Sequence, residues 1–238
     1  MKFKSAFPYI TAFVLVPLCI AVGVFAFRGK AYLPVSVCIA LLSCLPFFLA
    51  FEKKNGNVQL AVILAVMTAL SVLGRFAFAA IPHFKPVSAI VIITGMYLGA
   101  QSGFLCGALS AVLSNILFGQ GPWTPFQMLA WGLIGLFAAL LGGILKKNKI
   151  ALAVFGALAG VFYSLIMDIW TVLWWEEFSL SRYLAAIASS GVVMLIYAAS
   201  NVIFLLLLAK PTGEKLRRVM KKYGLDSRTQ NNHGKEKI

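Results

Sequence analysis

Charged residues are scarce in this sequence, and acidic residues are the scarcest of them. Of the 238 residues, 12% are Asp, Glu, Lys or Arg and only seven are acidic, whereas 61% are hydrophobic. Soluble domains usually carry about 25% charged residues because their surfaces face water. With a mean hydropathy of +0.91, the composition excludes an ordinary soluble domain and indicates a protein whose surface faces lipid.

The sequence also lacks the motifs of several function classes. It contains no GxxxxGK[ST] phosphate loop, so any ATP hydrolysis must come from a partner. It has no HExxH motif, no second acidic residue within a span and no Ser/His pair in the core, which argues against an intramembrane enzyme. The four cysteines, Cys19, Cys38, Cys44 and Cys106, lie in apolar runs without a CxxC pair. We interpret them as small packing residues, and we expect no disulfide, metal site or cofactor.

Basic residues are the one abundant charged type, and their positions indicate their role. A net charge of +14 would suit a nucleic-acid-binding protein, but here the basic residues flank apolar runs. Nine of the 21 lie in the last 29 residues: Lys210, Lys215, Arg217, Arg218, Lys221, Lys222, Arg228, Lys235 and Lys237. Such a distribution sets membrane orientation and contacts anionic headgroups, so we expect no nucleic-acid partner. Within this tail, 213–225 predicts a basic amphipathic helix on the inner leaflet.

Long apolar runs supply eight candidate spans near the length of a membrane helix, about 20 residues. They cover 8–27, 31–51, 58–81, 86–99, 103–118, 125–145, 150–174 and 183–208. The stretch 86–118 would be about 50 Å long as one helix, so we divide it near Ala100–Ser102 into two short helices. The first run is longer than the core of a signal peptide and is interpreted as a retained span. The predicted fold class is therefore all-α, a polytopic membrane helix bundle.

The positive-inside rule orients this bundle. With the N-terminus inside, 16 of the 21 basic residues face the cytoplasm and four face outside, while Arg75 lies within a span. A single span at 86–118 would place the N-terminus outside but would keep the loop 146–149 and the C-terminal tail inside. We therefore expect a cytoplasmic C-terminus. In the eight-span arrangement three connections, 82–86, 119–124 and 175–182, face outside.

Polar and aromatic side chains gather beside these three connections. A polar or charged group in lipid is costly, so each is a functional-site hypothesis. The candidates for ligand binding are Arg75, His83, Lys85, Asn115, Gln120, Trp123, Gln127, Trp131, Asp168 and Trp170. We expect them to lie at one membrane depth, which predicts an outward-facing pocket.

Each of these candidates also has a structural alternative. Arg75 and Asp168, which we expect to pair, either polarise a ligand or fix helix register as an ion pair. Trp123 and Trp131 are favoured as ligand-stacking residues over members of an interfacial aromatic belt. The His and Lys of 82–86 either touch the ligand or face water.

Small residues four apart follow the span 58–81, at Ala61, Ala65 and Ala69. Such a row lets another helix approach closely, which drives helix packing in lipid. From the spacing alone, the row either packs inside the bundle or docks a partner membrane protein.

The block from Arg75 to Leu141 contains IPHFKP at 81–86, Asn115, and GQGPWTPFQMLAWGLIG at 119–135. This block resembles the substrate-binding S components of energy-coupling factor (ECF) vitamin transporters. The resemblance implies a six-helix core at 57–209. The chain departs from that six-helix pattern by two extra transmembrane helices in 1–56 and by the basic tail 210–238.

The same resemblance implies partners and a location. In that family the substrate lies under the outer loops, and the small-residue row docks a transmembrane coupling subunit that works with two cytoplasmic ATPases. The S component would topple in a bacterial plasma membrane to deliver its ligand inward. The GPWTPFQM segment is most similar to cobalamin-type members.

We therefore predict a binding module, not an enzyme, that captures a vitamin or related micronutrient, with cobalamin as the first candidate. The alternative is a stand-alone secondary transporter or channel with Arg75 and Asp168 in a proton or ion path. That alternative favours inverted repeats or more buried charges, and the sequence shows neither.

Overall fold

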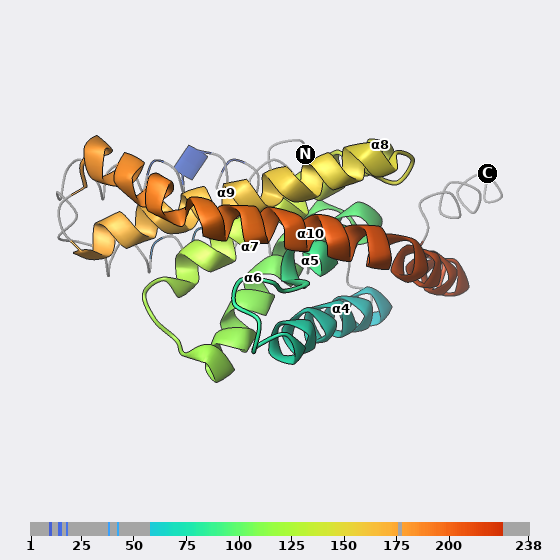
Figure 1. Cartoon of the computed structure of the whole chain (residues 1–238). Coiled ribbons are helices and arrows are strands. Elements are labelled where there is room, and N and C mark those ends of the chain that lie inside the picture. Colours follow the sequence, from blue (N-terminus) through green and yellow to red (C-terminus); the bar gives the residue numbers. More distant parts are fainter. Residues whose placement is uncertain are drawn as a thin grey trace.

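The computed structural model describes residues 58–175 and 178–225, with six isolated positions before residue 43. The helices of this part are α4 (Val58–Ala77), α5 (Val87–Leu98), α6 (Ala100–Phe118), α7 (Thr124–Leu140), α8 (Gly142–Leu145), α9 (Lys149–Trp175) and α10 (Leu180–Lys222), and it contains no strand. Four helices, α4, α6, α9 and α10, are long and apolar enough to cross a membrane, and α5 and α7 are shorter apolar helices. The prediction of an all-α polytopic bundle is confirmed (Figure 1). The two spans predicted in 1–56 lie outside the described residues, apart from isolated positions.

The predicted division of 86–118 into two helices is confirmed, and it occurs at Gly99. α5 ends at Leu98 and α6 begins at Ala100. Gly99 has φ +93°, a backbone conformation that residues with a Cβ rarely adopt. Its N–H donates to the Gly95 carbonyl at 3.1 Å. Two short helices therefore replace one overlong span, because a single glycine reverses the backbone between them.

Glycines also allow α5, α6 and α7 to pack with their backbones in contact. A Cβ on Gly95 would overlap the carbonyl oxygen of Gly135, and a Cβ on Gly135 would overlap the backbone of Gly103. Gly107 lies in the same way against the backbone of Trp131. Small residues at helix crossings are the usual means of close packing in lipid, where van der Waals contact drives association.

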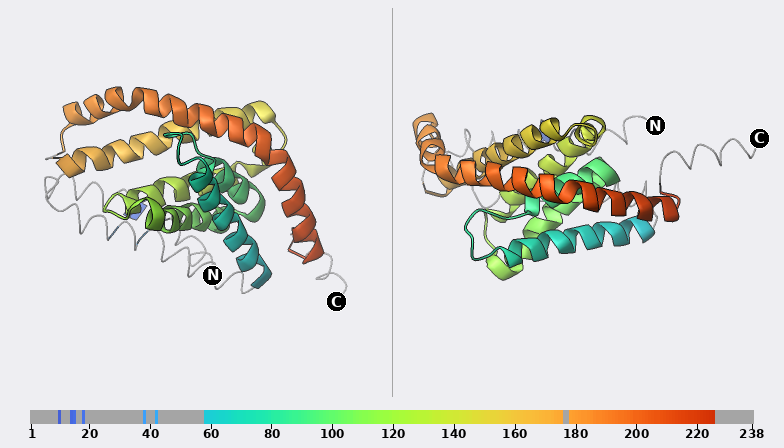
Figure 2. Two further views of the ribbon diagram at one scale, coloured as in Figure 1. Left: turned by 60° about the horizontal axis from the view of Figure 1, so that its bottom comes forward. Right: turned by 45° about the vertical axis from the view of Figure 1, so that its right-hand side comes forward.

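α9 and α10 form a long antiparallel hairpin. A Cβ on Gly160 of α9 would lie 2.6 Å from the backbone nitrogen of Ala198 in α10. One turn farther along, Asn201 Nδ2 donates to the Gly156 carbonyl at 3.1 Å. Figures 1 and 2 show the two helices side by side, with the end that joins them projecting beyond α7.

α10 is longer than predicted. The last span was expected to end at residue 208, whereas the helix continues to Lys222 and contains Pro211. Proline removes a backbone donor and bends a helix, and the left view of Figure 2 shows α10 changing direction as its colour turns from orange to red. The amphipathic helix predicted at 213–225 is therefore the last part of α10. It faces the first turns of α4 across a groove that includes Leu216 and Ile63.

Two regions of the bundle matter for function. We call the surroundings of the connections 78–86 and 119–123 the loop end. We call the surroundings of α8, the start of α9 and the bend of α10 the tail end.

Candidate polar ligand site at the loop end

Arg75 lies in the last turn of α4, and its side chain reaches α6 and α7. Its Nη1 donates to Ser114 Oγ and to Asn115 Oδ1, the second bond at 2.7 Å. The guanidinium carbon lies 4.7 Å from the ring centroid of Phe118 and 5.3 Å from that of Trp131. A cation over an aromatic face is attracted by the negative charge of that face. Hydrogen bonds and ring contacts together fix the guanidinium at the loop end.

Asn115 connects Arg75 to α7 and α9. Its side chain is only 1% exposed, and its Nδ2 donates to Thr124 Oγ1 at 2.9 Å and to Gln127 Oε1 at 2.7 Å. Gln127 Nε2 in turn donates to the Tyr163 hydroxyl at 3.0 Å. We call the chain Arg75–Asn115–Gln127–Tyr163 the polar network. Each of its buried polar groups has a partner, as a low-dielectric interior requires.

Aromatic rings extend the polar network to α10. The Trp131 and Tyr163 rings stack with centroids 5.1 Å apart and planes 18° apart. The Tyr163 and Tyr197 rings meet edge to face at 5.0 Å. His83 of the α4–α5 connection adopts φ +59°, and its Nδ1 lies 3.3 Å from the Tyr197 hydroxyl. Side chains from α4, α6, α7, α9 and α10 thus converge under one loop.

The α4–α5 connection places two basic side chains beside the polar network. The Lys85 N–H donates to Ser200 Oγ at 2.9 Å, and Ser200 Oγ donates back to the Lys85 carbonyl at 3.1 Å. Lys85 Nζ lies 4.9 Å from the Phe118 ring that Arg75 also contacts. Burial and the charge of Arg75 lower the pKa of Lys85, and burial and the charge of Lys85 lower the pKa of His83. Among the described residues, the side chains of Arg75 and Lys85 both contact neutral groups. The loop end therefore carries positive charge that no described acidic side chain balances.

The expected pairing of Arg75 with Asp168 is wrong. The Asp168 carboxylate accepts a hydrogen bond from Ser190 of α10 at 2.7 Å, whereas Arg75 bonds to α6. The reason is the hairpin register, which turns Asp168 toward α10.

The three outer connections do not all meet, and the expectation of one common depth for the candidates stays a prediction. The α4–α5 connection meets α10 at Ser200, about 30 Å of helix from Leu180 at 1.5 Å per residue. The third connection, 175–182, therefore lies far along the hairpin from the α4–α5 connection, although Trp170 near the end of α9 still contacts Phe126 at the start of α7.

Three other predicted candidates stabilise this region. Gln120 donates to a backbone carbonyl of α6 at 2.7 Å and accepts from Thr124 Oγ1 at 3.0 Å, which closes the α6–α7 connection. The Trp123 ring covers Gly121, where any Cβ would overlap it. Trp170 is buried, with its ring 5.6 Å from a phenylalanine ring of α7. Gln120 is linked to the polar network through Thr124, and Trp123 and Trp170 border it.

The loop-end residues that were not among the sequence candidates include Ser114, Phe118, Tyr163 and Tyr197. Ser114 and Phe118 carry no distinguishing signal, since the chain has 19 phenylalanines and serine is common in membrane helices. Tyr163 could have been selected, because a hydroxyl in the middle of an apolar run needs a partner in lipid.

The small-residue row lies on the outside of the described bundle. Ala61, Ala65 and Ala69 are all exposed, whereas Leu64 and Met67 on the other face of α4 are buried. The alternative in which this row packs inside the described helices therefore loses support.

Comparison with known proteins identifies the family. A family model described as ECF-type riboflavin transporter, S component, matches residues 55–217. The chain belongs to this family. It is a substrate-binding subunit of an ECF-type transporter. S components of this family are transporter subunits, not enzymes, and generally work with transmembrane and ATPase subunits. The matched residues coincide closely with the predicted core at 57–209.

The S component also has curated relatives. Two UPF0397 proteins of Aliivibrio fischeri, from strain MJ11 and strain ATCC 700601 / ES114, are each 27% identical over 161 residues. The alignments cover 60% of this chain and 86% of each relative. No solved structure matches the chain.

Proposed function

We propose that this S component captures a vitamin with a flat, acceptor-rich ring system at the loop end, for ATP-driven import by partner subunits. The observation that carries the proposal is the polar network, which joins four helices inside an apolar bundle. Polar groups in such surroundings are costly and are retained where they bind a substrate.

The chemistry of the loop end indicates the kind of ligand. The Arg75 guanidinium and the Lys85 ammonium are hydrogen-bond donors without acceptor capacity, so they favour carbonyl and other acceptor atoms. The Phe118 ring next to them is 37% exposed and can contact a flat ring, whereas Trp131 is buried against Tyr163 and supports the site from beneath. A planar ring system with carbonyl-bearing edges meets both requirements.

Two vitamins are candidates. Cobalamin is favoured by the resemblance of the GPWTPFQM segment to cobalamin-type members, and its corrin ring carries amide side chains. Riboflavin is favoured by the description of the matching family, and its isoalloxazine ring carries two carbonyl groups. Both fit the donor-rich, aromatic character of the loop end, so binding must discriminate between them.

The test is to purify the full chain in detergent, identify any bound small molecule by mass spectrometry, and titrate cobalamin and riboflavin by calorimetry. We expect tight, saturable binding of one of the two by the chain alone. A folded protein that binds neither vitamin, and that carries no bound molecule, would refute the proposal.

We further propose that Ala61, Ala65 and Ala69 dock the transmembrane coupling subunit, which assembles with two cytoplasmic ATPases. Their exposure on α4 supports this role, because a partner helix can reach the row without displacing a described one. In this arrangement the loop end faces outside and the tail end faces the cytoplasm of a bacterial cell, in accord with the basic residues near α8 and Pro211.

The stand-alone transporter is the weaker alternative. It requires Arg75 and Asp168 in one proton or ion path, and these residues bond to different helices. Transport by the chain without ATPase partners would revive it.

A further inference from the structure

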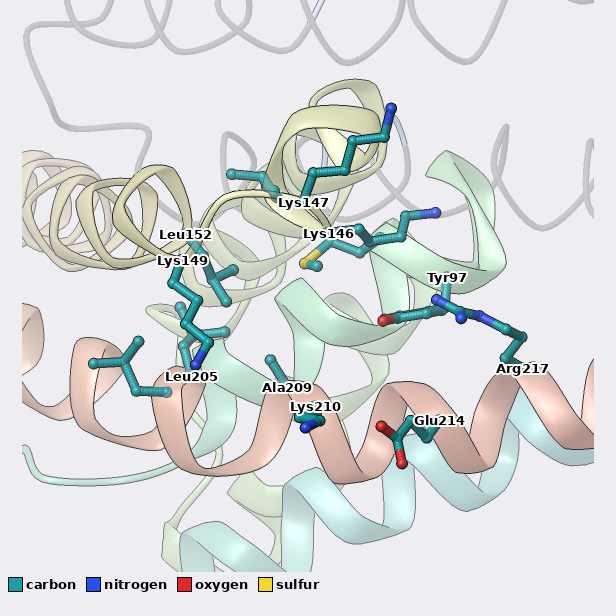
Figure 3. Close-up of a pocket in the computed structure, with 13 residues that line it drawn as sticks. Tyr97, Lys146, Lys147, Lys149, Leu152, Leu205, Ala209, Lys210, Glu214 and Arg217 are labelled. Carbon is teal, nitrogen blue, oxygen red and sulfur yellow. The ribbon is translucent and has the colours of Figure 1, made fainter.

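A cavity lies at the tail end, between the end of α5, the α8–α9 turn and the bend of α10 (Figure 3). Its volume is about 290 Å³. Five basic residues line it: Lys146, Lys147, Lys149, Lys210 and Arg217. Glu214 is the one acidic residue of the lining, so five positive charges and one negative charge give the cavity a net charge of +4. We call this cavity the tail pocket.

The hairpin register places two of these cations on one level. Asn201 bonds to Gly156 across the α9–α10 interface, and in an antiparallel pair the start of α9 then lies beside the residues that precede Pro211. Lys149 and Lys210 therefore enter the tail pocket from neighbouring helices, as Figure 3 shows. Like charges gathered in one cavity repel, and a bound anion removes that repulsion.

The tail pocket is apolar beneath its charged rim. Leu152, Leu205 and Ala209 contribute to the lining and are buried. Leu206 also lines it and remains 49% exposed, which leaves an apolar side chain open toward the surrounding lipid. An occupant that satisfies both parts must carry a negative headgroup and an apolar body.

The cations lie where the apolar segments of two helices end. Lys149 is the first residue of α9, and Lys210 directly follows the run Leu205–Ala209. This is the level at which lipid headgroups meet a membrane protein, and basic pockets between helices on the cytoplasmic side bind anionic headgroups. A soluble anion would use the rim and leave the apolar part of the pocket uncovered.

We propose that the tail pocket binds the phosphate group of an anionic phospholipid from the leaflet on the tail side. The phosphate oxygens accept from Lys149 and Lys210, and the acyl chains cover the apolar lining near Leu206. Because the pocket joins α9 to the bend of α10, the bound lipid holds these two helices together at the tail end. This site is separate from the polar network and independent of which vitamin the protein binds.

The test uses the full chain in a zwitterionic detergent and native mass spectrometry. Phosphatidylglycerol and phosphatidylcholine with the same acyl chains are titrated in parallel, and inorganic phosphate is titrated separately with thermal unfolding as the readout. The pocket variant is Lys149→Gln/Lys210→Gln. The matched control is Arg218→Gln/Lys221→Gln, which removes the same charge from exposed positions of α10 outside the tail pocket.

We expect phosphatidylglycerol to bind at least about tenfold more tightly than phosphatidylcholine, and the pocket variant to lose about thirtyfold in that affinity, near fivefold for each lysine. The control variant should retain its affinity within about twofold, since its charges lie outside the pocket.

Three outcomes would overturn the proposal. Equal binding of the two lipids would mean that the tail pocket does not require an anionic headgroup. An equal loss in both variants indicates diffuse attraction by the basic helix. Stabilisation by inorganic phosphate that disappears in the pocket variant, without a preference among lipids, indicates a soluble anion. Unfolding temperatures of both variants near that of the unmodified chain establish that neither result reflects misfolding.

Discussion

Replacing Asn115 with alanine is the sharpest test of the polar network. Asn115 is 1% exposed and makes three side-chain hydrogen bonds, with Arg75, Thr124 and Gln127. If the network is the ligand site, Asn115→Ala should weaken vitamin binding and leave the bundle folded.

The expected cost in stability follows from what each partner keeps. Thr124 still donates to Gln120, Gln127 still donates to Tyr163, and Arg75 still donates to Ser114. Hydrogen bonds between membrane helices contribute on average about 0.6 kcal/mol each, so losing three costs about 2 kcal/mol in the free energy of unfolding. The chain should therefore remain folded with a lower unfolding temperature.

Asn115→Ala should weaken vitamin binding more than a matched control substitution does. Asn115 aims Arg75 and Gln127 at the loop end, and losing that alignment should weaken binding at least about tenfold, or 1.4 kcal/mol. The matched control is Asn201→Ala, because Asn201 is equally buried but bonds only to a backbone carbonyl in the α9–α10 hairpin. Calorimetric titration and thermal unfolding of both variants measure the two effects.

The control should lose stability and keep its affinity. The reasoning fails if both variants lose affinity to the same extent, since general loosening of the bundle would then explain the result. It also fails if Asn115→Ala, still folded, binds as tightly as the unmodified chain.

Three further predictions concern docking, packing and pH. Ala61→Leu/Ala65→Leu should abolish vitamin uptake by cells and leave vitamin binding by the purified chain intact. The control Ala199→Leu, at an exposed alanine of α10, should change neither. Loss of binding in the double variant would assign the row to internal packing. Gly135→Ala should lower the free energy of unfolding by about 1–3 kcal/mol or more, because its Cβ overlaps the Gly103 backbone. Gly143→Ala, which has open space, should leave the unfolding temperature unchanged, and similar melting of the two variants would contradict the backbone contact. Burial and the charge of Lys85 hold the pKa of His83 below its ordinary 6.5. The unfolded chain therefore takes up the proton first, and the free energy of unfolding should fall as the pH drops below about 6.5. Thermal unfolding between about pH 7.5 and about pH 5.5 should show a smaller drop in unfolding temperature for His83→Gln, and an unchanged drop would exclude His83 as the cause.

The helices themselves could be predicted because lipid imposes a strong constraint on sequence. Each spanning helix must present apolar side chains over a fixed length, so α4, α9 and the hydrophobic part of α10 are visible as uninterrupted runs. The division of 86–118 could also be predicted, since one helix would exceed the bilayer, but it was placed near Ala100–Ser102 and the structure has it at Gly99. The continuation of α10 through Pro211 could not, because proline usually ends a helix and only the neighbouring helices can support a bent one.

The residues that form the candidate site could be predicted, but not which of them bond to each other. Arg75, Asn115, Gln127 and Trp131 stood out as polar or aromatic groups in apolar runs, and the structure brings all four together. The predicted partner of Asp168 was wrong, because sequence position gives only an approximate depth in the membrane. Hydrogen bonding also depends on which way each residue faces around its helix.

By itself, then, the sequence determined that this chain is a helical membrane protein, approximately where its spans lie, and which side chains are costly enough in lipid to suggest a function. These follow from local composition, because the transfer of each residue into lipid depends on its own chemistry and its immediate neighbours. Only the tertiary structure decided that Arg75 bonds to Asn115 and Asp168 to Ser190, that the small-residue row on α4 faces outward, and that Lys149 lies level with Lys210. Those outcomes depend on helix rotation and register, which are set by contacts between glycines and side chains far apart in the chain.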